Sequence, residues 1–165
     1  MTFDPERDLS IARFIRAPRA TVWSAWTEPR QFEQWWVPAP AICRAVRFEP
    51  VPGGAMLTEI SEDGKPFAPH MNACFLVVEP QRRLVFTDAL HGGWRPASTS
   101  FMSAEITLDD AEGGTQYTAR VMHSDRAARD RHAELGFYDG WGTVIEQLAR
   151  FVEPPFESLP PVSAS

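Results

Sequence analysis

The segment from residue 131 to residue 151 constrains the fold more than any other part of the chain. Its large apolar side chains recur at the spacing of one helix face: Phe137, Trp141, Val144, Ile145, Leu148 and Phe151. Gly136, Gly140 and Gly142 fall in the first half of the same segment, where each glycine costs roughly 1 kcal/mol relative to alanine. We therefore expect a long closing helix whose bare backbone either packs closely or leaves open space beside it.

Composition excludes several classes of protein. The 165 residues are 44% apolar and 23% charged, which is typical of one globular domain. A net charge of −6 without a basic stripe disfavours nucleic-acid binding, because that binding needs clustered cations. No apolar run approaches the length of a membrane span. The chain has only Cys43 and Cys74, no CxxC motif and no signal peptide, so we expect a cytoplasmic protein with free thiols.

Turn residues divide the rest of the chain into short elements. A first strand is predicted at 9–16, and Pro18 and Pro29 each begin a short helix. Further strands are predicted at 42–49, 55–61, 70–79, 82–89, 99–108 and 115–123. Ser124 or Asp125 then caps the closing helix.

This order predicts an α+β domain over residues 8–152. An antiparallel sheet of seven strands needs a cover on one face, and only the closing helix is long enough to provide it. The sheet is therefore expected to curve around that helix. The Pro- and Ser-rich residues 153–165 are predicted to form a disordered tail.

Alternation along the last strand predicts which side chains face the helix. Arg120 is expected to meet water, so Tyr117, Val121 and His123 should point inward. Glu134 lies about 60° from the direction of the apolar helix face. Its carboxylate either approaches His123 or complements the helix dipole.

Several aromatic and histidine positions leave alternatives open. His123 is a structural hydrogen-bonding group, a polar group in a pocket or a catalytic residue, and His70 is structural or pocket-lining. Trp94 either anchors its loop or closes a cavity opening. Trp35 and Trp36 are adjacent on a predicted helix, so only one of them is expected to point inward. His132 is expected to be exposed to solvent.

Sequence motifs give no direct sign of an enzyme. The chain has no nucleotide-binding glycine motif, no GxSxG elbow and no HExxH pair. No histidine has another histidine four residues away. We therefore expect neither a metal site nor a cofactor, and the catalytic residues, if the protein is an enzyme, stay unknown.

Four segments resemble the START-like (SRPBCC) superfamily when taken in order: APRATVWSAWTEPRQFEQWW, VVEPQRRLVFTDAL, GGTQYTARVMH and ELGFYDGWGTVIEQLARF. Within that superfamily the chain is most similar to proteins related to the C-terminal domain of the heat-shock protein 90 ATPase activator. The resemblance implies a helix-grip fold, in which a curved sheet holds a long C-terminal helix beside an elongated cavity. Members of the superfamily bind lipids, hormones or aromatic natural products, some cyclise polyketides, and the activator domain acts on a chaperone.

The leading functional hypothesis is a module that binds a small hydrophobic or aromatic molecule in that cavity. The residues expected to line it are Phe32, Trp35, Trp36, His70, Trp94, Met102, Tyr117, Val121, His123, Glu134, Phe137 and Trp141. One alternative is a polyketide cyclase-like or hydrolase-like enzyme in which His123 transfers a proton in the same pocket. The other is a chaperone-linked interaction module, which would expose a large apolar patch.

Overall fold

A curved antiparallel sheet and two closing helices form the body of the protein in the computed structural model, which describes residues 2–155. The sheet has seven strands, as predicted, and their order is β1-β9-β8-β5-β4-β3-β2. The elements in chain order are β1 (Asp8–Ile15), α1 (Arg19–Thr27), α2 (Pro29–Phe32), β2 (Ile42–Phe48), β3 (Ala55–Ser61), β4 (Ala68–Glu79), β5 (Arg83–Thr87), β6 (Leu90–His91), β7 (Arg95–Pro96), β8 (Ser103–Ala111), β9 (Gly114–Met122), α3 (Arg126–Glu134) and α4 (Phe137–Val152). The short strands β6 and β7 pair only with each other.

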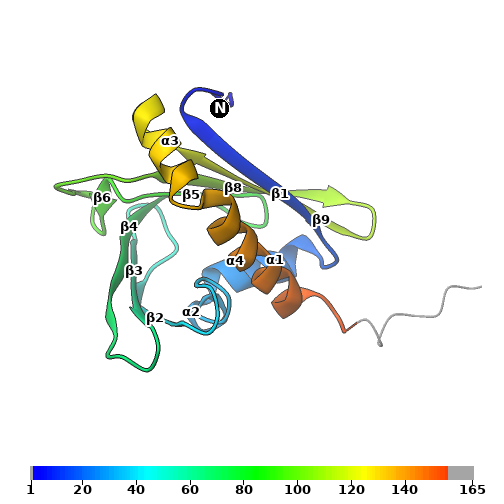
Figure 1. The fold of residues 1–165 in the computed structure, drawn as a ribbon. Helices are drawn as coiled ribbons and strands as arrows, with labels where there is room; N and C mark the ends of the chain where they lie inside the picture. Colours follow the sequence, from blue (N-terminus) through cyan, green and yellow to red (C-terminus); the bar gives the residue numbers. More distant parts are fainter. Residues whose placement is uncertain (1, 156–165) are drawn as a thin grey trace, which may run out of the picture.

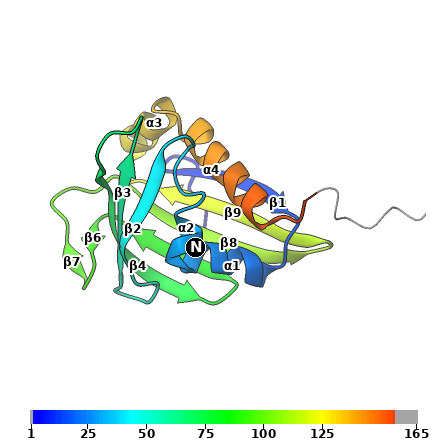
Figure 2. The ribbon, with the colours of Figure 1, turned by 90° about the horizontal axis from the view of Figure 1, so that it is seen from below.

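Irregular pairing at one end of the sheet accompanies its curvature. The pairs β2–β3, β3–β4 and β4–β5 each contain a register shift, whereas β1–β9, β9–β8 and β8–β5 pair without one. A bulge of this kind bends the strand that carries it and increases its twist. The strands β2, β3 and β4 consequently turn away from the rest of the sheet, and α4 lies inside the curve (Figure 1). Figure 2 shows α1 and α2 on the same side of the sheet as α4.

The two faces of β9 differ in what they bury. Tyr117, Ala119 and Val121 are fully buried among apolar side chains, which confirms their predicted inward direction. Arg120 points to the other face, but the prediction that it meets water is wrong, since only 7% of it is exposed. The side chains of Asp8 and Glu105, 3.6 and 3.3 Å from its guanidinium, form ion pairs with it.

Both members of the Trp35–Trp36 pair are buried, so the prediction that only one points inward is wrong. The reason is local: α2 ends at Phe32, and the two tryptophans occupy a turn in which the 100° spacing of a helix does not apply. The Trp35 indole Nε1 donates a hydrogen bond to the Ala25 carbonyl at 3.0 Å.

The closing segment forms two helices in place of the single helix predicted. Asp125 caps α3 by accepting a hydrogen bond from the Ala128 amide at 2.8 Å. It is one of the two residues, Ser124 and Asp125, predicted to cap the closing helix. Gly136 then adopts a left-handed conformation with φ of 99° and starts α4 in a new direction. Of the predicted apolar face, the residues from Phe137 to Leu148 are buried, but Phe151 is 43% exposed.

Polar contacts fix both flanks of α4. The Gln147 amide nitrogen donates to the carbonyls of Trp35 and Val37 at 2.9 and 2.8 Å, and its oxygen accepts from the Ala39 amide at 2.7 Å. On the opposite flank, Glu146 forms an ion pair with Arg13 of β1 at 2.6 Å. The helix is thereby tied to the segment after α2 and to the first strand at once.

The end of the domain is tied to β1 as well. Glu153, the first residue of the predicted tail, accepts a hydrogen bond from the Arg16 amide at 2.9 Å and forms an ion pair with Arg13. Residues 156–165 of that predicted tail lie outside the described residues. Within residues 2–155, none of the helices combines the length and apolarity that a membrane span requires.

Gly140 and Gly136 should respond in opposite ways to substitution by alanine. A Cβ atom added at Gly140 would meet no atom within 4 Å, so Gly140→Ala should raise the free energy of unfolding by about 0.5–1 kcal/mol through helix propensity. Gly136→Ala should lower it by about 1–2 kcal/mol, because its φ is left-handed. Urea denaturation of both variants measures the difference, and equal effects of the two changes would contradict it.

Candidate functional site

The space between α4 and the sheet is filled by one cluster of buried side chains. Eight of the residues predicted to line a cavity belong to it: Phe32, Trp35, Trp36, Met102, Tyr117, Val121, Phe137 and Trp141. A tyrosine at its centre is tied to α1, since Trp26 Nε1 donates to the Tyr117 hydroxyl at 3.1 Å. Burial raises the pKa of that hydroxyl above its ordinary value, so Tyr117 is neutral.

A series of ring contacts leads from this cluster to the protein surface. Trp36 meets Trp141 edge-on with ring centres 5.9 Å apart, and Trp141 lies 5.9 Å from Phe137. Phe137 meets the imidazole of His132 edge-on at 5.2 Å. The His132 ring lies 4.5 Å from Phe101, which is 42% exposed. The series thus runs from the interior, past the start of α4, to a surface aromatic ring.

Two histidines form a buried pair near the outer end of this series. His123 Nε2 lies 2.8 Å from His132 Nδ1, and both side chains are only 8% exposed. The expectation that His132 meets solvent is therefore wrong. It sits on the inner side of α3, where it is the one buried residue of that helix. The partner of His123 is His132, and Glu134 is exposed on the same helix.

The backbone decides which ring nitrogens carry protons. His123 Nδ1 lies 2.9 Å from the Arg7 carbonyl oxygen, which only accepts hydrogen bonds, so His123 Nδ1 carries the hydrogen. In a neutral pair, His123 Nε2 is then an acceptor, and His132 Nδ1 donates to it. This leaves an unshared electron pair on His132 Nε2.

Burial disfavours a positive charge on His132. Desolvation, together with the nearby His123 ring, lowers the pKa of His132 from 6.5 to about 4. Within the described residues, no carboxylate forms an ion pair or hydrogen bond with either ring that would stabilise an imidazolium. The pair presents an uncharged hydrogen-bond acceptor at the end of the aromatic series.

Phe101 covers the pair and separates two hollows. A hollow of about 210 Å³ is lined by residues 100–103 and 122–124, and one of about 290 Å³ is lined by Ser100, Phe101, Ala127, Ala128 and Arg131. Ser100 and Phe101 line both. Asp88 holds this segment by accepting hydrogen bonds from the Phe101 and Met102 amides at 2.9 and 3.1 Å. His123 lines the smaller of the two hollows, and His132 lines neither.

Three of the predicted site residues lie apart from this cluster. His70 is exposed on β4, with its Nδ1 3.1 Å from the Thr58 hydroxyl. Trp94 is 52% exposed in the turn between β6 and β7 and lies against Gly53, where a Cβ would come within 2.4 Å of the indole nitrogen. Glu134 ends α3 with its side chain in solvent. The three residues do not meet at one site, and a role of each in binding stays a prediction.

Sequence reasoning missed Phe101 and His132. Phe101 falls inside a predicted strand, whereas β8 begins only at Ser103, and the residues before it form a loop held by Asp88. His132 stands on a largely polar helix that gives no apolar stripe to orient it. No local signal marks the loop, because the bonds from Asp88 to the Phe101 and Met102 amides span 13 and 14 residues.

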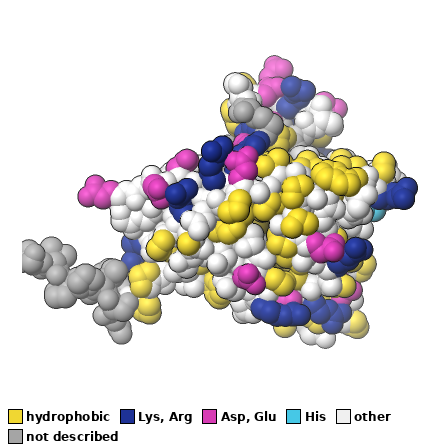
Figure 3. All heavy atoms as spheres, turned by 180° about the vertical axis from the view of Figure 1, so that it is seen from behind, with side chains coloured by type: hydrophobic (Ala, Val, Ile, Leu, Met, Phe, Trp, Pro, Cys, Tyr) yellow, Lys and Arg dark blue, Asp and Glu magenta, His cyan; other side chains and the backbone are white. Residues whose placement is uncertain are grey.

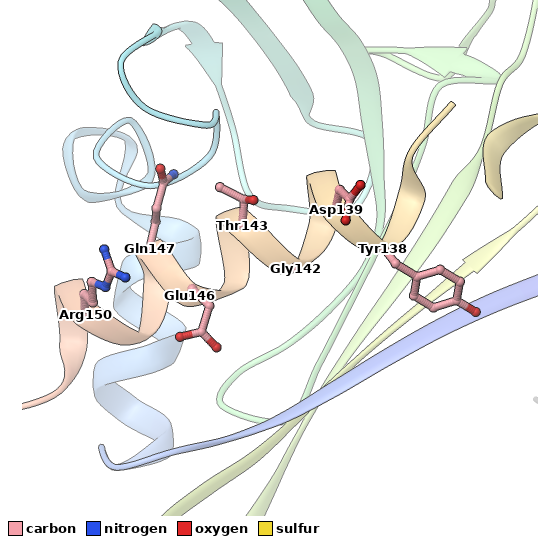
Figure 4. A pocket seen from close by; sticks show the side chains of 7 residues that line it. All are labelled: Tyr138, Asp139, Gly142, Thr143, Glu146, Gln147 and Arg150. Atoms are coloured by element: carbon pink, nitrogen blue, oxygen red, sulfur yellow. The ribbon is translucent and has the colours of Figure 1, made fainter. Parts of the chain in front are cut away.

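Another hollow lies on the outer face of α4. It measures about 490 Å³, and all of its lining residues come from that one helix (Figure 4). Tyr138 points toward β1 and Gln147 points toward the segment after α2 in this view, with an open helix surface between them. A surface built by a single helix does not surround a ligand, so we place the candidate site at the histidine pair.

Charge on the protein surface is mixed. On the face in Figure 3, cationic side chains lie next to acidic ones, with apolar side chains between them.

Most of the chain matches the model of one protein family. The model of the family described as "Activator of Hsp90 ATPase homolog 1-like protein" matches residues 16–153, which include the whole aromatic cluster and both histidines of the pair. The chain belongs to this family. This confirms the resemblance found in the sequence.

Solved structures agree with the assignment. A crystal structure of a protein from Nitrosomonas europaea is 38% identical and superposes with a TM-score of 0.84, covering 90% of this chain and 96% of that one. Structures from Arthrobacter aurescens and Aeromonas hydrophila share the fold at 23% and 19% identity. Their TM-scores are 0.77 and 0.66, and they cover 94% and 88% of this chain and 91% of each of those chains. The Aeromonas structure is described as an AHSA1-like protein. No curated protein matches the chain significantly.

The pKa of His132 predicts how stability depends on pH. The folded protein resists protonation of this ring, whereas the unfolded chain takes up a proton below pH 6.5. Its contribution to stability is thus fully present above pH 6.5 and is lost as the pH falls toward 4, with a slope of at most about 1.4 kcal/mol per pH unit.

Urea denaturation of the wild type and of His132→Phe between pH 4.5 and 7.5 isolates this contribution. The phenylalanine ring keeps the contacts with Phe101 and Phe137 but cannot titrate. We expect the free energy of unfolding of the wild type to fall relative to that of His132→Phe as the pH is lowered. A difference that is constant over this range would show that His132 does not titrate as described.

Proposed function

We propose that the protein binds a small hydrophobic or aromatic molecule at the outer end of the series of rings, beside Phe101 and the first turn of α4. The observation that carries this proposal is the continuous series of rings from Trp36 to Phe101, described above. Stacked and edge-on ring faces favour flat apolar molecules over polar ones. Family membership supports the proposal, since the fold encloses its interior between a curved sheet and a helix.

Two polar groups in the series have no hydrogen-bond partner among the described residues, and one of them is buried. The Trp36 indole Nε1 is fully shielded from solvent and donates no hydrogen bond. His132 Nε2 accepts none. An unmade hydrogen bond at a buried donor costs about 1–3 kcal/mol. The unmade bond of the buried Trp36 donor calls for an explanation, and a ligand that accepts from it is the one we propose.

The size of the site suits a small molecule. The two hollows beside Phe101 measure about 210 and 290 Å³, and joined they fall in the range of small-molecule pockets. Gly140 lies in the turn of α4 between Phe137 and Trp141, and no atom occupies the space beyond it. A bare backbone at this position leaves room beside the two rings that would contact a ligand.

The chemistry of the histidine pair favours binding over catalysis. A general base works best when its pKa is near the working pH. The pKa of His132 is lowered to about 4, so the ring is a weak base at neutral pH while its electron pair still accepts a hydrogen bond. We therefore prefer a binding module to the cyclase-like enzyme considered from the sequence.

Titration with 2-methoxynaphthalene, followed by quenching of tryptophan fluorescence, tests the proposal. We expect saturable binding to the wild type and at least tenfold weaker binding to Gly140→Leu, because the leucine side chain would fill the space beside Phe137 and Trp141. Gly140→Ala is the matched control and should bind as the wild type does. Native mass spectrometry of protein purified without denaturation should also show a bound small molecule.

The controls separate loss of binding from loss of folding. Gly140→Leu must retain a cooperative unfolding transition for its affinity to count. The absence of saturable binding to the wild type would overturn the proposal. Equal affinity of Gly140→Leu and Gly140→Ala for the probe would show that the ligand does not bind beside this flank of α4.

A further inference from the structure

We infer that the ligand carries a neutral hydroxyl group, phenolic or enolic, and donates its hydrogen to Nε2 of His132. The inference rests on the proposed function and adds the chemical class of the ligand. It starts from the direction of the hydrogen bonds at the histidine pair, which is set by the backbone of the protein.

The direction follows from one carbonyl group. The Arg7 carbonyl oxygen accepts from the His123 amide at 3.1 Å and from His123 Nδ1 at 2.9 Å. A carbonyl oxygen has two electron pairs and no hydrogen, so both bonds run toward it. The imidazole of His123 is therefore fixed as an Nδ1–H tautomer, and its Nε2 accepts from His132 Nδ1 at 2.8 Å.

The remaining nitrogen of His132 is an acceptor only. A phenol or enol hydroxyl is complementary to it, because it brings a donor hydrogen and no charge. A ketone, an ether or a carboxylate would place an electron pair against an electron pair. Protonation of His132 would relieve this repulsion, but burial disfavours the charged imidazolium, and no carboxylate contacts either ring within the described residues.

The surroundings favour an aromatic hydroxyl over a water-like molecule. The His132 ring lies between Phe101 at 4.5 Å and Phe137 at 5.2 Å. A flat ring that replaces Phe101 over the imidazole would keep an aromatic contact and bring its hydroxyl close to the histidine. Arg131 lines the adjoining hollow and carries a positive charge, but its side chain is exposed to solvent. A guanidinium in water gives little preference for a neutral ligand.

A matched set of probes tests the inference: 2-naphthol, 2-methoxynaphthalene, naphthalene and naphthalene-2-carboxylate, titrated at pH 7.5 by tryptophan fluorescence. We expect the wild type to bind 2-naphthol at least tenfold more tightly than 2-methoxynaphthalene or naphthalene. The double variant His123→Phe/His132→Phe should bind all three neutral probes with similar affinity, since it keeps aromatic rings at both positions and lacks both acceptors; His132→Phe alone would leave Nε2 of His123 as a free acceptor. His91→Phe, at a histidine outside the pair, is the control and should keep the preference.

A second measurement needs no variant. The unprotonated Nε2 of His132 has its own ¹⁵N resonance, and 2-naphthol should move it upfield, whereas 2-methoxynaphthalene should not. A wild type that fails to discriminate 2-naphthol from its methyl ether overturns the inference, as does a preference that survives in the double variant His123→Phe/His132→Phe. Tighter binding of naphthalene-2-carboxylate than of 2-naphthol would assign recognition to Arg131 and overturn it too.

The outcomes also separate the two proposals. Binding of all neutral probes with equal affinity would leave the proposed binding function intact and reject the hydroxyl class. Failure of every probe to bind the wild type would reject both.

Discussion

The burial of one face of α4 inside the curved sheet is the constraint on which the rest of the structure depends. An apolar helix face and an apolar sheet face gain free energy by leaving water together, at roughly 25 cal/mol for each Å² of apolar surface. A flat sheet would cover only part of that helix. The three irregular strand pairs at one end of the sheet let it turn around α4. The aromatic residues then fill the curve, since few other side chains are large enough.

The order and type of most elements could be predicted because they depend on local patterns. Alternation along β9, the prolines before α1 and α2, and the helical spacing from Phe137 to Leu148 are all visible in the sequence. The failures came where a distant residue decides. Arg120 is buried because Asp8 and Glu105 lie on the neighbouring strands, and their register is not visible in the local sequence.

The candidate site shows the same division. Side chains on regular elements, such as Tyr117, Val121 and Phe137, were placed correctly inside the core by their periodicity. The histidine pair was not found, because it joins β9 to α3 through a contact that also needs a backbone carbonyl near the N-terminus. A pairing of side chains across elements is a tertiary property, and composition and spacing carry little information about it.

The break at Gly136 has a consequence for how the protein could diversify. It divides the closing segment into α4, which is fastened to the body on both flanks, and α3, which buries only His132. The core therefore places few demands on the other side chains of α3. Substitutions there would alter the wall above the histidine pair at little cost in stability. The wall of the proposed site can thus change through substitutions on one surface helix, while the packing of the core depends on the other helix.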